Sequence, residues 1–132
     1  MKPHHRLQAW NKSIQLVKDL HVVTTRFPGE EKFGIVAQIR RAGVSVPTNI
    51  AEGAARNSKR EFIRFLCIAM GSLSELDTLL LLSMELKYLA QEEFDNLMFH
   101  LEVIARLIKG LINKLQRDLK PPDAPTSENR GK

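Results

Sequence analysis

The segment 38–64 constrains the fold of this 132-residue chain most, because an apolar stripe continues through a proline near its middle. At about 100° per residue, one helical face collects Ile35, Ile39, Ala42, Val46, Ile50 and Gly53. Pro47 lacks a backbone donor and clashes with the carbonyl one turn earlier, which kinks or breaks a helix. Because the stripe keeps its phase, we predict one helix over about residues 30–55, kinked near Pro47, in preference to two helices broken near Val46.

This predicted helix also has a strip of polar residues and a strip of residues with small side chains. The polar strip consists of Gln38, Arg41, Ser45, Asn49, Glu52 and Arg56, and the strip of small residues of Ala37, Val44, Ala51 and Ala55. Small side chains let a neighbouring backbone approach closely. We therefore predict tight helix packing or a contact between subunits at Ser45, Asn49, Ala51, Glu52 and Gly53.

Three more helical patterns complete the chain. The first carries Leu7, Trp10, Ile14, Val17 and Leu20 and ends before the Pro28-Gly29 break, while residues 1–5 look frayed. Ser58 and Glu61 fit a capping box that starts a helix over about 59–87, and the last helix covers about 92–119. Short connections favour antiparallel neighbours, so we predict an all-α, up-down-up-down four-helix bundle over residues 1–120 and a disordered, Pro-rich tail over 121–132.

Composition bounds the class of protein. Apolar residues make up 43% of the chain and aromatic residues 6%, which suits one helical domain. The single cysteine, Cys67, cannot form an internal disulfide and fits a reducing compartment. No apolar run marks a signal peptide, and the longest aliphatic run, 79–82, is far too short to span a bilayer. We expect a cytoplasmic protein that does not use a membrane.

The formal charge of +5 is unevenly placed along the predicted bundle. One end would gather the start of the first helix, the junction of the second and third, and the end of the fourth. Its bases are Lys2, Arg6, Arg56, Lys59, Arg60, Arg64, Lys109, Lys114, Arg117 and Lys120. The opposite end would gather the acids Glu30, Glu31, Asp77, Glu85, Glu92, Glu93 and Asp95.

Two of these bases oppose the helix dipole. Lys59 and Arg60 lie in the first helical turn, where a cation is mildly unfavourable, so a ligand explains them better than stability does. A solvated cluster or a charged contact between subunits remains the alternative to a polyanion ligand. The candidate nucleic-acid-binding residues are Arg40, Arg41, Arg56, Lys59, Arg60, Arg64, Lys114 and Arg117.

No pattern of catalytic or metal-binding residues is visible. Di-iron bundles carry a glutamate three residues before a histidine on each of two helices, and neither His21 nor His100 has an acid at that position. The chain also lacks HExxH, CxxC and phosphate-cradling glycine motifs. We predict a protein that is not an enzyme and uses no metal and no cofactor.

Several short motifs together resemble one bacterial family. They are Phe27-Pro28, Gln38-Ile39-Arg40-Arg41-Ala42, Ser45-Val46-Pro47, Asn49-Ile50-Ala51-Glu52-Gly53, Glu61-Phe62, Phe65-Leu66, Ala69 and Gly71-Ser72. Over about residues 7–117 the chain resembles the four-helix-bundle proteins encoded in intervening sequences of 23S ribosomal RNA genes. The block 40–53 is the most specific part, although Gly43 stands where that block often has alanine.

The resemblance implies an up-down bundle assembled into a ring, typically a pentamer. The family also includes accessory proteins of diversity-generating retroelements, which look like basic rings that bind nucleic acid and a reverse transcriptase. The family pattern marks no catalytic residue. We therefore expect a homo-oligomeric helical bundle that binds nucleic acid, with RNA preferred as ligand, through its basic end. The alternative is a homo-oligomeric scaffold that binds another protein.

Overall fold

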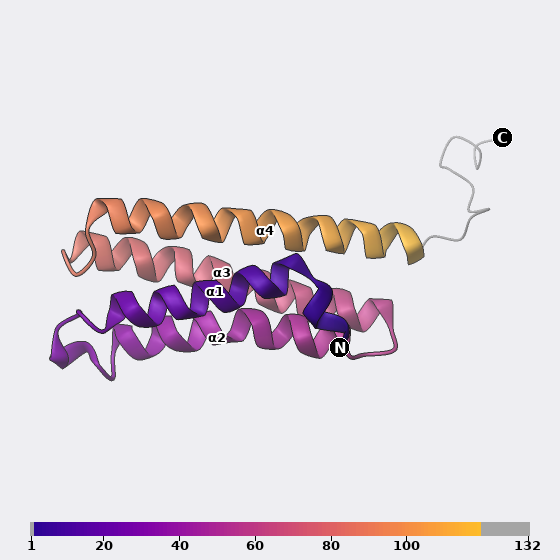
Figure 1. Ribbon diagram of the computed structural model, residues 1–132, viewed down its shortest axis with the longest axis horizontal. Coiled ribbons are helices and arrows are strands. Elements are labelled where there is room, and N and C mark those ends of the chain that lie inside the picture. Colours follow the sequence, from indigo (N-terminus) through magenta and orange to yellow (C-terminus); the bar gives the residue numbers. More distant parts are fainter. Residues whose placement is uncertain (1, 120–132) are drawn as a thin grey trace, which may run out of the picture.

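The computed structural model describes residues 2–119, which form four long helices and two short ones (Figure 1). The long helices are α1 (Gln8–Thr24), α2 (Ile35–Ala54), α3 (Lys59–Glu85) and α4 (Gln91–Leu119). Two single-turn 3₁₀ helices, η1 (Pro3–Arg6) and η2 (Gly29–Glu31), precede α1 and α2. Lys120 and the predicted tail 121–132 lie outside the described residues.

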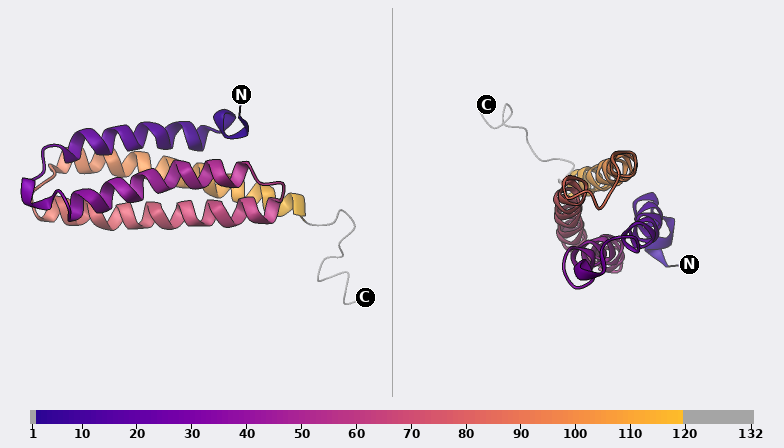
Figure 2. Two further views of the ribbon diagram at one scale, coloured as in Figure 1. Left: turned by 90° about the horizontal axis from the view of Figure 1, so that it is seen from below. Right: turned by 90° about the vertical axis from the view of Figure 1, so that its left-hand side faces the viewer.

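The predicted all-α, up-down bundle is confirmed. Consecutive helices run in opposite directions, and contacts join α1 to α2, α2 to α3, α3 to α4, and α4 back to α1 (Figure 2). Both diagonal pairs lack such contacts. The α2–α3 and α3–α4 connections are short, whereas residues 25–34 with η2 join α1 to α2, and each helix packs beside the one before it.

The apolar stripes meet in the centre of the bundle. Leu66, Leu73, Leu101 and Ile108 lie in this core, and their exposed fractions range from 0% to 4%. The stripe of α2 is buried on both sides of Pro47, and a single helix crosses that proline as predicted. The bend itself stays a prediction.

The predicted start of α2 near residue 30 is wrong. Pro28 and Gly29 open the tight turn η2 instead, and α2 begins at Ile35 after Gly34. The Glu31 carboxylate accepts a hydrogen bond from the Ile35 backbone amide at 3.5 Å. It therefore satisfies an amide at the start of α2 from outside the helix.

The start of α3 is confirmed at Lys59. Ser58 Oγ accepts a hydrogen bond from the Glu61 backbone amide at 3.2 Å, which is the first half of the predicted capping box. The Glu61 carboxylate accepts from Arg64 Nε at 2.9 Å. The acid of the box thus positions an arginine in the next turn.

The prediction of a frayed N-terminus is wrong for residues 3–5. The 3₁₀ helix η1 packs against α1 and α2. The rings of His4 and His5 lie 4.9 and 5.2 Å from the ring of Trp10, between their centroids. No residue of η1 is buried, so these contacts with the Trp10 ring hold the segment against α1 while it stays largely exposed.

Within residues 2–119, α3 is long and apolar enough to cross a bilayer by length and composition alone. Core helices of soluble proteins pass the same test, and 44% of the most apolar part of α3 is buried in the bundle. The helix packs between α2 and α4, and its core stripe accounts for much of its apolar character.

Candidate nucleic-acid interface

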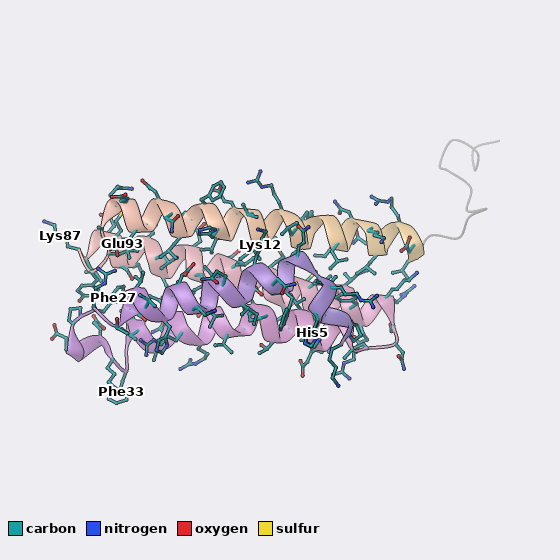
Figure 3. All side chains as sticks on the ribbon, viewed as in Figure 1. His5, Lys12, Phe27, Phe33, Lys87 and Glu93 are labelled. Carbon is teal, nitrogen blue, oxygen red and sulfur yellow. The ribbon has the colours of Figure 1, made fainter. Side chains whose placement is uncertain are left out.

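One end of the bundle gathers the N-terminus, the α2–α3 junction and the end of α4 (Figure 1). Figure 3 shows His5 toward this end, whereas Phe33 and Lys87 lie at the other. Lys59 Nζ lies 3.7 Å from Asp118 Oδ2, which ties the first turn of α3 to the last turn of α4. The segments that carry most of the predicted basic residues are therefore neighbours. We call this surface the basic end, and define it by Lys2, Arg6, Arg56, Lys59, Arg60, Arg64, Lys114 and Arg117.

The α2–α3 junction is compact because Gly53 has no side chain. A Cβ atom at Gly53 would lie 2.8 Å from Phe62 Cδ1 and 2.9 Å from Phe65 Cβ. Alanine there would clash with the Phe62 ring and with the Cβ of Phe65, so the glycine permits the close approach of α2 to α3. Tight packing was predicted for Gly53, and the structure places it at that contact.

Two arginines of the basic end lie against one aromatic ring. The guanidinium carbon of Arg56 is 5.1 Å from the centroid of the Phe65 ring, and that of Arg64 is 5.0 Å from it. Phe65 itself is only 7% exposed. Both distances fall within the range of cation–π attraction.

The other cations of the basic end point into solvent. Arg60, Lys114 and Arg117 are exposed and take part in no ion pair among residues 2–119. The Lys59–Asp118 pair is exposed on both sides, and such pairs contribute little stability. A polyanion could replace these weak partners at little cost.

Arg40 and Arg41 lie apart from the basic end. They are in the first half of α2, about 20 Å from its C-terminal end at 1.5 Å per residue. Arg40 Nε donates to Thr24 Oγ1 at 3.0 Å, and its terminal nitrogen donates to the His21 carbonyl oxygen at 3.2 Å. Arg40 thus braces α2 against α1, while Arg41 remains exposed on the polar strip.

The remaining residues of the predicted packing block occupy different surroundings. Ser45 joins α2 to α3, because Ser72 Oγ of α3 donates to Ser45 Oγ at 2.7 Å. Within α2, Asn49 Nδ2 donates to the same Ser45 oxygen at 3.0 Å. Ala51 lines an apolar groove between α1 and α2, and Glu52 is exposed. An interface between subunits at these residues stays a prediction.

The opposite end contains most of the predicted acids together with some bases, whereas Asp77 lies eight residues before the end of α3. Arg26 pairs there with Glu93, and this hydrogen bond lowers the pKa of the Glu93 carboxyl. Tyr88 Oη donates to Glu31 Oε2 at 3.0 Å, which raises the pKa of the Tyr88 phenol. Lys87 also lies in this region, so the acidic end is partly neutralised.

Sequence reasoning missed the aromatic groups at the basic end. The Phe65 ring contacts two of the bases, and Trp10 of α1 packs against His4 and His5 of η1. The adjacency of Arg64 and Phe65 in sequence was a signal for one contact, but nothing in the sequence pairs Arg56 with that ring. Among residues 2–119, no three His, Cys, Asp or Glu side chains form a group that could hold a metal ion.

Comparisons with known proteins agree with this architecture. A solved structure titled as a protein of unknown function from the S23 ribosomal protein family of Bacteroides thetaiotaomicron matches with a TM-score of 0.74 and 25% identity. The match covers 80% of this chain and 95% of that one. Among curated proteins there is no match. The family model described as 23S rRNA-intervening sequence protein matches residues 5–110, and the chain therefore belongs to that family.

Proposed function

We propose that this chain is a non-enzymatic protein that binds nucleic acid, with RNA as the expected ligand, through the basic end. The observation that carries the proposal is the convergence of cations from the α2–α3 junction and the end of α4 on one surface, which the Lys59–Asp118 contact ties together. Several of these side chains are exposed and have no ion-pair partner within residues 2–119.

The expected mechanism is neutralisation of phosphates. Each lysine or arginine that contacts a phosphate releases a condensed counterion, and this release supplies most of the affinity of non-specific binding. Because Phe65 is buried under two guanidinium groups, its ring is covered and cannot stack on a base. We therefore expect little sequence preference.

A salt titration of the unmodified protein tests this proposal. Filter binding with one labelled RNA and one DNA of equal length should give a logarithm of affinity that falls linearly with the logarithm of salt concentration, by about 0.7–0.9 for each phosphate contacted. Unrelated sequences should bind with similar affinity. Absence of salt-dependent binding to either polymer would contradict the proposal.

We also propose that the chain forms a homo-oligomer. An apolar groove of about 450 Å³ lies between α1 and α2, with Trp10, Ile14 and Pro47 among its lining residues. At the end of α3, Leu82 and the following cap residue Leu86 are 47% and 52% exposed. Large contiguous apolar patches are rare on monomeric proteins and mark protein–protein contacts, so the groove is the stronger of these two observations.

Light scattering tests the assembly. At tens of micromolar, the measured mass should be a multiple of the 15.0 kDa chain, and the family resemblance leads us to expect five subunits. A ring would present the basic end once per subunit, so individually weak contacts would act together. A mass of one chain at this concentration would rule the oligomer out.

A protein partner is the second candidate function. Phe33 favours it, since this aromatic side chain is 89% exposed at the end of the bundle opposite the bases. Large exposed aromatic groups commonly anchor protein–protein contacts. This alternative predicts little nucleic-acid binding at physiological salt.

A further inference from the structure

We infer that Arg56, Arg64 and Phe65 form a phosphate-binding site in which the Phe65 ring positions the two arginines. This inference rests on the proposed binding of nucleic acid and specifies where a phosphate group is held. It starts from the contact of two guanidinium groups with a single ring.

Two like charges close together normally repel, and long arginine side chains normally sample many rotamers. Here the guanidinium carbons are 5.1 and 5.0 Å from one centroid, so they lie no more than about 10 Å apart. The negative faces of the ring attract both cations and limit their movement. The pair is therefore held in place before a ligand arrives, which reduces the ordering cost of binding.

The ring is itself fixed by the helix junction. Phe65 is 7% exposed, and its Cβ lies where a side chain on Gly53 would clash. The two helices meet closely at this point, so the ring cannot shift without opening the α2–α3 contact. The Phe65 ring therefore has a defined position relative to the end of α2 and the start of α3.

Each arginine keeps donors for a ligand. Arg64 uses Nε to donate to Glu61 Oε2 at 2.9 Å, and this leaves its two terminal nitrogens. Arg56 makes no side-chain hydrogen bond and no ion pair within residues 2–119. The planar fork of a guanidinium group matches phosphate oxygens, so the pair can bind one phosphate jointly or two successive ones.

The test uses the full chain with inorganic pyrophosphate as the probe. In the unmodified protein, the Nε–Hε NMR signals of Arg56 and Arg64 should shift together on titration, and those of Arg41 should not. Replacing Phe65 with leucine should weaken pyrophosphate binding by roughly fivefold, because both cation–π contacts are lost. Phe65→Tyr keeps the ring and should restore binding.

Phe62→Leu is the matched control. Phe62 lies on α3, as Phe65 does, and also packs against Gly53 of α2, but its ring makes no cation–π contact with Arg56 or Arg64. It should bind pyrophosphate as the unmodified protein does. If Phe65→Leu fails to fold, the double variant Arg56→Lys, Arg64→Lys takes its place. This variant keeps both charges and removes the planar guanidinium groups, and it should weaken pyrophosphate binding to a similar degree.

The outcomes separate this inference from the proposed function. Unchanged binding by Phe65→Leu, or shifts confined to other arginines, would overturn the phosphate site even if RNA still binds. Pyrophosphate binding at Arg56 and Arg64 without any RNA binding would uphold the site as an anion site and overturn the proposed function.

Discussion

Replacing Leu66 with alanine is expected to lower the free energy of unfolding by about 2–5 kcal/mol. The Leu66 side chain is 0% exposed and belongs to the continuous apolar core of the four helices. Alanine would remove its buried methyl groups and leave a cavity that tightly packed neighbours fill only in part. The loss is a large fraction of the total stability of about 5–15 kcal/mol for a typical domain. Urea denaturation followed by circular dichroism measures it.

Leu81→Ala on the same helix is the control. Leu81 is 43% exposed, so the same substitution should cost well under the range expected for Leu66. Equal losses at the two positions would show that the faces of α3 are assigned wrongly or that another subunit covers Leu81. Measuring both variants over a range of protein concentrations separates these explanations, because only a subunit contact depends on concentration.

The sequence predicts the helices where the signal is local. The stripe of α2 continues through Pro47, and Ser58 lies three residues before Glu61, so the course of α2 and the start of α3 could both be read directly. The start of α2 could not be predicted from the sequence in this way. The Glu31 carboxylate suits a helical first turn, but here it contacts Tyr88, 57 residues away, and no local pattern shows such a contact.

The site was predictable in outline for the same reason. An up-down topology places the α2–α3 junction beside the end of α4. Lys59 and Arg60 start α3 at this junction, so their position near the end of α4 follows from the topology. The contact of Arg56 with Phe65 depends on the geometry of a short turn between two helices, which periodicity does not specify. Likewise, an arginine such as Arg40 is a common phosphate ligand. Only the packing of α1 on α2 shows that Arg40 donates a hydrogen bond to Thr24 instead.

Changing Lys59, Arg60 and Arg64 together to glutamine is expected to weaken RNA binding by about tenfold or more at 0.1 M salt. Three exposed charged contacts of about 0.2–1 kcal/mol each combine to an effect of this order, and a ring of subunits would multiply it. The loss should be similar for every RNA sequence, and the salt slope should flatten by about one for each phosphate contact removed. Assembly should be unchanged, since these residues lie off the core stripe of α3.

A second triple variant, Lys18, Lys32 and Lys87 to glutamine, removes the same charge outside the basic end. All three side chains are exposed, so folding should be preserved. This control accounts for the general effect of net charge on attraction to a polyanion. Size-exclusion chromatography of both variants checks that each keeps the oligomeric state of the unmodified protein.

Filter binding of RNA by the two triple variants, side by side at 0.1 M salt, tests most directly whether the basic end is the nucleic-acid interface. We predict that glutamine at Lys59, Arg60 and Arg64 weakens binding by about tenfold or more, and that the control variant stays within about threefold of the unmodified protein. Equal loss in both variants, or no loss in the first, would contradict a nucleic-acid interface at the junction of α2 and α3.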